Sequence, residues 1–235
     1  AFVAFALVVR FWFHLTTAIA SYGRARAGAR IAAGSQTVGT CCGDRGVGYH
    51  ARMALFEAEH IGVQFRRDGQ PFVPFADVSF SLEAGCLYNL TGPSGSGKST
   101  LLNACALMLP RSGGTLALEG IPVDRFKPTE WRRRVCLVPQ AASLVPGTVR
   151  DNLLFPWTLK VNAGSPKPDD DVLNEMLSLA MLDGVTLDHA AAQLSGGQLA
   201  RVALLRAFAT RPTVLLLDEV EAALDEESAV AVSRL

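Results

Sequence analysis

Acidic residues are nearly absent from the first part of this 235-residue chain. Residues 1–52 contain one acidic residue, Asp44, against six arginines, whereas residues 53–235 contain 21 acidic and 16 basic residues. The overall net charge of zero therefore combines +5 at the N-terminal end with −5 in the main body. Because binding to nucleic-acid phosphates needs a basic face, the mildly acidic main body predicts no nucleic-acid partner.

Cysteine is sparse as well, and its distribution argues against a disulfide framework and against a cysteine-ligated metal site. The five cysteines are Cys41, Cys42, Cys86, Cys105 and Cys136. An odd number without paired metal-ligand spacing predicts free thiols in a reducing compartment. With 49% hydrophobic residues, a chain of this length buries a core without such staples. A disordered chain and a disulfide-rich miniprotein are both excluded.

No methionine precedes Met53, where a regular strand-like pattern begins. We therefore interpret residues 1–52 as a leader of doubtful origin, either upstream translation or a fused remnant, and residues 53–235 as the functional domain. Two alternatives stay open. Residues 1–20 are nearly all apolar, as at the end of a membrane span, although Arg10 costs about 2.5–3.5 kcal/mol on an insertion scale. The arginine-rich, acid-poor stretch that follows also suits a targeting peptide.

The main body alternates short apolar runs with amphipathic segments. The runs at 86–90, 135–138 and 214–217 are typical of buried strands. The segments at 99–109 and 199–210 predict helices that end before a proline. Further short strands are predicted at 54–58, 61–65, 78–82 and 116–118. Strands that alternate with helices predict an α/β fold with a largely parallel sheet covered by helices.

A glycine-rich loop connects the predicted strand at 86–90 to the helix that follows. Residues 92–99 read GPSGSGKS and fit the phosphate-binding pattern G-x-x-x-x-G-K-[ST]. Glycines let backbone N–H groups wrap a polyphosphate at a helix N-terminus, where the helix dipole favours negative charge. Lys98 can reach the outer phosphates, and the Ser99 hydroxyl can ligate Mg²⁺. We expect a nucleotide to be held by Gly92, Pro93, Ser94, Gly95, Ser96, Gly97, Lys98, Ser99 and Thr100.

An acidic pair follows the apolar run at 214–217. A carboxylate at the carboxyl end of a parallel strand lies beside the nucleotide crevice, so Asp218 is a predicted Mg²⁺ ligand together with Ser99. Glu219 suits the general base that polarises the attacking water. Alone, such a pair is more often a solvated loop, but the phosphate-binding loop reverses that preference.

A second glycine motif, LSGGQ at 194–198, stands immediately before the predicted helix at 199–210. Two glycines and a serine at a helix start form a second anion-binding nest. Together with the phosphate-binding loop, this motif resembles the signature of the ATP-binding-cassette (ABC) ATPases, over about residues 54–234. The resemblance implies a P-loop NTPase core with a mostly parallel sheet, a small antiparallel β subdomain and a helical signature subdomain.

The resemblance also assigns roles to individual residues. Gln140 takes the place of the family's glutamine that contacts Mg²⁺ and the attacking water, so it joins Glu219 and Lys98 as a catalytic residue. Phe65 takes the place of the aromatic residue that stacks on adenine, although a core or edge-strand role explains it too. The signature residues would bind the γ-phosphate of an ATP held by a partner chain, and they are Ser195, Gly196, Gly197 and Gln198.

In the family two cassettes pair head to tail around ATP and Mg²⁺. The resemblance therefore implies a homodimer that hydrolyses ATP and that powers a polytopic membrane permease, as a peripheral subunit at the cytoplasmic face of the inner membrane. Segment 149–157, VRDNLLFPW, together with residues 92–109 and 137–149, resembles the ATPase subunits of FetAB-type iron exporters, which implies export of a metal ion such as iron. The alternative cargo is an amino acid, another metal ion or a lipid. A soluble regulatory or DNA-associated ABC ATPase is the alternative.

A histidine expected by the resemblance is missing. The family's switch histidine follows the acidic pair on a later strand, yet all four histidines here precede Asp218. We therefore expect residues 53–235 to form an ABC ATPase domain that is incomplete at its C-terminal end. Such a chain should bind ATP better than it hydrolyses it.

Overall fold

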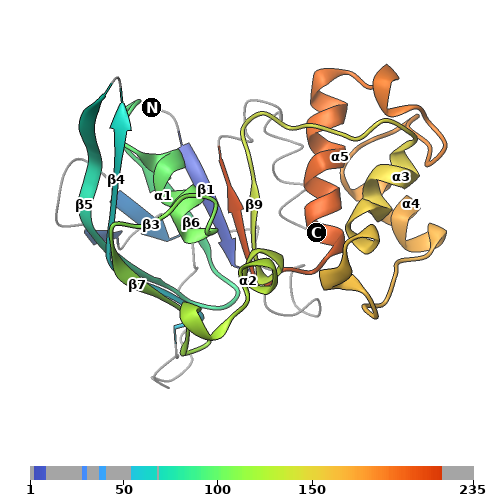
Figure 1. Ribbon diagram of the computed structural model, residues 1–235. Helices are drawn as coiled ribbons and strands as arrows, with labels where there is room; N and C mark the ends of the chain where they lie inside the picture. Colours follow the sequence, from blue (N-terminus) through green and yellow to red (C-terminus); the bar gives the residue numbers. More distant parts are fainter. Residues whose placement is uncertain (1–2, 9–27, 31–36, 41–53, 68, 219–235) are drawn as a thin grey trace.

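The computed structural model describes residues 3–8, 28–30, 37–40, 54–67 and 69–218 (Figure 1). This part of the chain forms two sheets and a group of helices. The six-stranded sheet has the order β2-β3-β6-β1-β10-β9. Its strands are β1 (Val3–Val8), β2 (Gly28–Arg30), β3 (Thr37–Thr40), β6 (Leu87–Thr91), β9 (Val135–Val138) and β10 (Val214–Leu217).

Strands β6, β9 and β10 of this sheet run in one direction. β10 pairs with β9 in parallel, and β1 pairs antiparallel with both β6 and β10, so β6 also runs parallel to β10. These are the strands predicted at 86–90, 135–138 and 214–217, and their common direction agrees with the predicted α/β class. Among the described strands, direct parallel pairing occurs only between β9 and β10, because β1 lies between β6 and β10. The expectation of a mostly parallel sheet is therefore wrong for the described pairings, although the α/β class holds.

Strands β1, β2 and β3, whose pairings are all antiparallel, come from the segment interpreted as a leader. β3 pairs with β6 on the side opposite β1, and β2 pairs with β3. The sequence does not predict these pairings, because a short apolar run such as 3–8 carries no periodicity that separates a buried strand from a membrane or targeting segment. The division of the chain at residue 53 stays a prediction.

Helices cover both faces of the sheet around β10. Val214 and Leu216 belong to a core that includes residues of α1 (Lys98–Cys105), whereas Leu215 and Leu217 pack with residues of α5 (Gly196–Ala209). Alternate residues of a strand point to opposite faces, so α1 and α5 lie on opposite sides of β10. Burial on both faces explains why this strand is a continuous apolar run.

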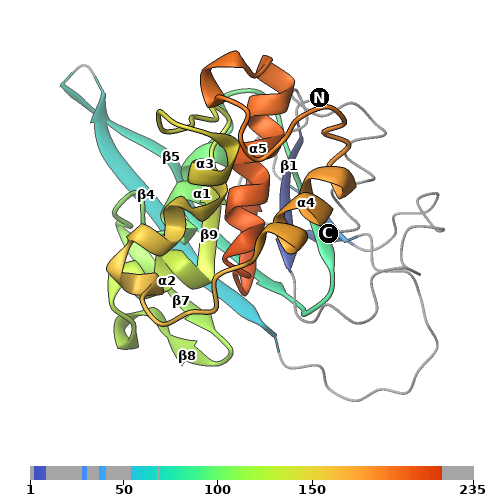
Figure 2. The same cartoon turned by 90° about the vertical axis from the view of Figure 1, so that its right-hand side faces the viewer.

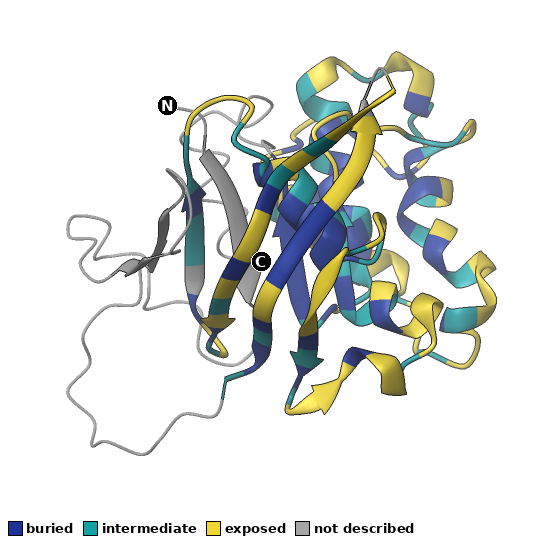
Figure 3. Ribbon diagram, turned by 60° about the vertical axis from the view of Figure 1, so that its left-hand side comes forward, coloured by how far each residue is buried: buried dark blue, intermediate teal, exposed yellow. Residues whose placement is uncertain are grey.

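The second sheet is antiparallel, with the order β5-β4-β7-β8, as expected for the small β subdomain. Its strands are β4 (Phe56–Arg67), β5 (Gln70–Leu82), β7 (Gly113–Leu118) and β8 (Ile121–Pro122). The sequence predicted two strands where β4 is one, because His60, at φ 52°, interrupts the alternation at a bulge between Ala58 and Ile61. Figure 3 shows exposed residues along β4 and β5 next to buried ones.

The remaining helices lie partly beside α5 and partly beside the sheets. They are the α-helices α2 (Pro128–Arg134), α3 (Val149–Leu154) and α4 (Asp170–Leu179), and the 3₁₀-helices η3 (Val123–Arg125), η4 (Phe155–Thr158), η5 (Lys160–Asn162) and η6 (Ala191–Gln193). α3 and α4 share a buried cluster with Val202 and Leu205 of α5 (Figure 2). α2 instead joins the sheet core through Trp131, which is fully buried and donates from Nε1 to the carbonyl of Cys105.

The cysteines differ from the expectation of free thiols. Cys105 and Cys136 are free, but Cys86 is disulfide-bonded, so the expectation is wrong for that residue. Burial raises the pKa of Cys105 to about 12 and the pKa of Cys136 to about 11, which keeps both thiols neutral near pH 7. Within the described residues, no helix has both the length and the hydropathy of a membrane span.

Candidate functional site

The glycine-rich loop between β6 and α1 takes the shape that its sequence predicts. Gly95 and Gly97 have φ values of 77° and 92°, in the left-handed region that favours glycine. A Cβ on Gly97 would lie 3.1 Å from the Phe75 ring, so the loop also needs glycine for space. The N–H of Ser96 donates to the carbonyl of Pro93 over 3.2 Å and closes the turn. Pro93, Ser94 and Gly95 are exposed, and Gly92, Ser96, Gly97 and Thr100 are half-buried.

Lys98 is folded into this loop. Its side chain is only 5% exposed, and Nζ donates to the carbonyl oxygens of Gly92 and Pro93 over 3.0 and 3.1 Å. A buried ammonium group needs such compensation. Two neutral carbonyls compensate a cation less well than an anion does, so this position favours a phosphate as an additional partner of Lys98.

Ser99 and Asp218 meet although 119 positions separate them in the chain. The Ser99 hydroxyl donates to Oδ1 of Asp218 over 2.8 Å, and Asp218 is 6% exposed. The N–H of Asp218 donates to the carbonyl of Val138, which fixes the residue at the end of β9 and β10. These groups offer hard oxygen ligands, which is the chemistry that Mg²⁺ prefers.

A site of this kind suits magnesium better than a transition metal. Among the described residues, no group of three or more His, Cys, Asp and Glu side chains could hold a metal ion. Mg²⁺ needs no such cage, since it commonly uses one or two protein ligands together with water and substrate phosphates. The Ser99–Asp218 pair therefore fits the predicted metal, and its assignment stays a prediction.

The other predicted residues of this site are Gln140, Glu219 and Phe65. Gln140 is exposed and follows β9 by two positions, so it leaves the sheet at the same edge as Asp218. Glu219 lies outside the described residues. Phe65, on β4, is 39% exposed, and its ring centroid lies 5.2 Å from that of Phe72 on β5. The same hairpin carries Phe75, which lies beside Gly97, so the hairpin of Phe65 packs against the loop.

The LSGGQ motif forms the N-terminus of α5. Ser195 is the N-cap: its hydroxyl accepts from the N–H of Gln198 over 3.3 Å, and the Gln198 side chain accepts from the N–H of Ser195 over 2.9 Å. Such a capping box fixes the first turn of a helix. Ser195 and Gly196 are exposed, and a Cβ on Gly196 would meet nothing within 4 Å. The helix start is thus open to a ligand or to another chain.

The structure does not bring the two glycine motifs together. Lys98, Ser99 and Asp218 gather at one edge of the sheet, whereas Ser195 to Gln198 belong to the helical part. Figure 1 shows α1 and α5 on opposite sides of β9. The described chain thus carries two separate helix starts, each at one of the predicted anion-binding motifs.

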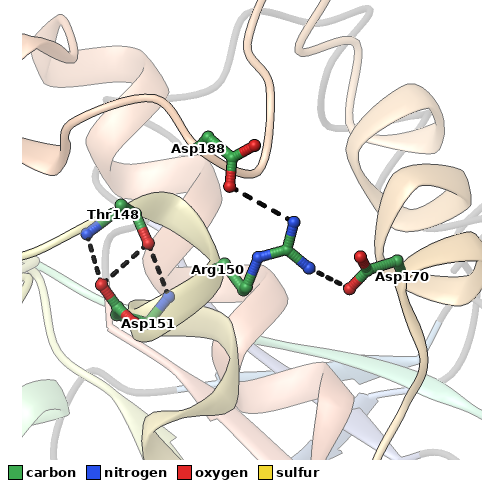
Figure 4. Close-up of polar contacts among 5 residues, drawn as sticks. All are labelled: Thr148, Arg150, Asp151, Asp170 and Asp188. Carbon is green, nitrogen blue, oxygen red and sulfur yellow. Dashed lines mark hydrogen bonds and ion pairs between the residues drawn. The ribbon is translucent and has the colours of Figure 1, made fainter.

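One polar network was not foreseen from the sequence. Arg150 of α3 is hydrogen-bonded to Asp170 and to Asp188 (Figure 4). Asp170 is the first residue of α4, and Asp188 lies shortly before η6. Since 20 and 38 positions separate these pairs, no local spacing could have revealed them.

The fold and the two motifs define an α/β nucleotide-binding protein of the P-loop class. The family model for "ABC transporter" matches residues 75–222, more than half of the chain. The chain therefore belongs to the ABC transporter family, and the resemblance seen in its motifs is confirmed.

Similar proteins carry different transport functions in their names. "Probable iron export ATP-binding protein FetA" of Escherichia coli is 40% identical over 152 residues, which cover 65% of this chain and 66% of that protein. "Methionine import ATP-binding protein MetN 1" of Pseudomonas fluorescens is 35% identical over 188 residues, 77% of this chain and 55% of that protein. "ATP-dependent lipid A-core flippase" of Xanthomonas euvesicatoria is 36% identical over 173 residues, which cover 72% of this chain and 29% of that protein. The chain thus spans two thirds or less of these relatives.

Solved structures agree with the fold. The dimeric structure of the bacterial ABC transporter cassette MJ0796 matches with a TM-score of 0.61 and 25% identity, over 75% of this chain and 79% of that one. A structure of the same cassette bound to ADP and Pi matches equally well. An Atm1-family exporter with ATP bound, at 21% identity and a TM-score of 0.62, covers 78% of this chain and 32% of its own. The predicted P-loop α/β fold is confirmed.

Substituting Lys98 tests the phosphate-binding loop. We expect Lys98→Ala to weaken ATP binding by about tenfold or more, because a charge-assisted contact to phosphate contributes about 1.5–3 kcal/mol. Titration of a fluorescent ATP analogue measures the affinity, and circular dichroism confirms the fold. Lys160→Ala, at an exposed lysine of η5, serves as the control. Equal affinities of the two variants would contradict the role of Lys98.

Proposed function

We propose that this chain is the ATP-binding and ATP-hydrolysing subunit of a membrane transporter. The observation that carries the proposal is the pairing of two features in one chain. One is a phosphate-binding loop with Lys98 buried inside it and Ser99 bonded to Asp218. The other is a separate, exposed helix start at Ser195. Family membership supports the proposal, and so do transport relatives; they do not favour the soluble alternative.

Each residue near the loop has a proposed part in hydrolysis. The loop amides and Lys98 hold the phosphates and offset their charge. Ser99, Asp218 and Gln140 would hold Mg²⁺, which neutralises charge that develops on the phosphate oxygens. Glu219, the residue after Asp218, would accept a proton from the attacking water. The water then bonds to the γ-phosphorus, and the bond from phosphorus to the leaving ADP oxygen breaks.

A dimer explains why the chain needs two anion-binding helix starts. The capped start of α5 is exposed and lies away from the loop of its own chain. In a head-to-tail pair, Ser195, Gly196 and Gly197 of one chain would face the γ-phosphate held by the other chain. Helix N-termini favour such an anion, and Gln198 keeps the first turn in place. ATP would then close the dimer, and hydrolysis would open it.

The proposed partner is a polytopic permease, with this chain peripheral at the cytoplasmic face of the inner membrane. The segment that resembles the FetAB-type subunits has a mixed surface: Phe155 is 36% exposed, while Pro156 is buried. Leu159, two residues after the segment, is 47% exposed. Exposed apolar side chains of this kind suit a protein partner. Iron or another metal ion is the proposed cargo class because of the similarity to FetA. Other relatives are named for methionine import and for a lipid A-core flippase, so a transport assay with the metal ion tests this cargo directly.

Glu219→Gln tests the proposed base. We expect this variant to keep ATP affinity within about twofold, since the amide has the size of the carboxylate, and to lose proton acceptance, which contributes about 10²–10⁴-fold to rate. In the presence of ATP, a dimer of this variant should therefore accumulate, and size-exclusion chromatography with light scattering detects it. Glu175→Gln, at an exposed position of α4, is the matched control. Wild-type hydrolysis by Glu219→Gln would show that another residue is the base.

Ser195→Arg tests the role of the signature motif between chains. The long cation should block closure of the ATP dimer in the Glu219→Gln background, while the single chain still binds ATP. Loss of the cap costs about 1 kcal/mol of folding stability, which a urea titration measures separately. Ser178→Arg places the same side chain on an exposed part of α4 and should leave the dimer intact. A dimer that forms equally in both variants would place the signature outside the interface.

The membrane partner is tested by affinity purification from detergent-solubilised membranes. We expect a protein with several hydrophobic spans to co-purify with the chain, and its reconstitution into vesicles then tests ATP-dependent movement of Fe²⁺. Phe155→Asp should reduce recovery of this partner without changing ATP affinity. A stable soluble complex with DNA and no membrane protein would overturn the transport proposal.

A further inference from the structure

The segment that follows Gln140 is paired with the segment that precedes the signature motif. Val149 donates its N–H to the carbonyl of His189 over 2.9 Å, and Arg150 donates to that of Leu187 over 2.8 Å. The N–H of Ala191 returns a bond to the carbonyl of Gly147 over 2.9 Å. A β-bridge between Thr148 and Ala190 completes this short antiparallel contact. Residues 147–150 and 187–191, called here the bridge, thus form one unit.

The start of α3 is a firm base for this bridge. Thr148 and Asp151 form a capping box, in which the Asp151 carboxylate accepts from the N–H and the hydroxyl of Thr148 (Figure 4). These hydrogen bonds lower the pKa of Asp151, with the backbone bond from Thr148 as the main cause. Asn152 is fully buried and bonds to the backbone of Val145 and Thr148. The backbone that carries Arg150 therefore has little freedom.

Arg150 extends from this base to two other elements. One end of its guanidinium group bonds to Asp170, in the first turn of α4. The other bonds to Asp188 of the bridge over 3.3 Å. Figure 4 shows the guanidinium lying between the two carboxylates. A planar guanidinium with several donors can serve two carboxylates at once, which a lysine ammonium does less well.

A second arginine connects α4 to the signature motif from its other end. Arg201 of α5 donates to the carbonyls of Ala180 and Met181, which follow α4, over 3.3 and 3.0 Å. Its Nε donates to the carbonyl of Gly197, within the motif, over 3.3 Å. The motif is therefore connected to Arg150 by two routes, through Asp188 along the chain and through α4.

We propose that Arg150 is a positioning residue for the signature motif. By bonding to Asp188 and Asp170 it holds residues 187–195 and α4 in one arrangement, and this arrangement directs the exposed N–H groups after Ser195 toward a partner chain. Arg150 touches no nucleotide in this account; it acts through the segment that leads to Ser195. The inference rests on the proposed ATP-dependent pairing of two chains.

The test compares Arg150→Gln with its parent in the Glu219→Gln background. We expect the ATP concentration for half-maximal dimer formation to rise by about fivefold, the effect of losing two exposed or half-exposed ion pairs. ATP affinity of the single chain should change by less than about twofold, because the phosphate-binding loop is separate. Amide hydrogen exchange at residues 187–197 of the single chain should become faster by a similar factor.

Two further variants and one control variant separate positioning from general stability. Asp188→Asn should have its own effect in the parent and almost none after Arg150→Gln, because both remove the same contact. Arg150→Lys should restore part of the dimer affinity, since it keeps the charge but not the two-sided geometry. Arg125→Gln, at an exposed arginine of η3, should resemble the parent in every measurement.

The possible failures are distinct. If the Glu219→Gln parent forms no dimer with ATP, the proposed function fails, whatever Arg150 does. If exchange at 187–197 is unchanged in Arg150→Gln, the positioning role is overturned, with or without a dimer. Additive effects of Arg150→Gln and Asp188→Asn would overturn it as well, as would equal losses of dimer formation and single-chain ATP affinity.

Discussion

The hydrogen bond from Ser99 to Asp218 is the contact on which the site depends. It joins the helix that follows β6 to the end of β10, and both strands reach the same edge of the sheet because they run in one direction. A bond of 2.8 Å tolerates little sliding of these strands. Burial of β10 on both faces opposes such sliding, since its residues alternate between a core that includes residues of α1 and a core that includes residues of α5. Packing of the apolar core thereby fixes the distance between Ser99 and Asp218.

α5 connects the two halves of the described structure. Leu204 and Ala207 pack with β9 and β10, while Val202 and Leu205 pack with α3 and α4. A helix advances about 100° per residue, so its neighbouring residues can face different cores. This arrangement explains how one helix holds the signature at its exposed end and still takes its orientation from the sheet. Lys98 and Ser195 do not contact each other, but the sheet that positions Lys98 also packs against α5, which begins after Ser195.

The glycine motifs could be predicted from the sequence because their geometry is local. Gly97 needs a positive φ, and Ser195 and Gln198 cap one turn, so a few adjacent letters specify each shape. Asp218 could be predicted too, because a buried strand delivers it to the edge of the sheet. The pairing of β1 between β6 and β10 could not, since an apolar run does not specify its partner strand. Nor could the contacts of Arg150, which depend on how α3, α4 and the bridge fold together.

The bridge limits how the helical part can move. Residues 139–146 connect β9 to it, and Asn152 fixes the last part of that connection to α3. A shift of Gln140 that reaches Gly147 therefore also reaches residues 187–191, because backbone hydrogen bonds join the two segments. From there only a few residues lead to Ser195. If two chains pair as proposed, a change near Gln140 of one chain thereby alters the signature that would serve the other chain, provided that Arg150 keeps α4 and the bridge together. This coupling requires no contact between the two glycine motifs, because the hydrogen bonds of the bridge and of Arg150 connect the segments that lead to them.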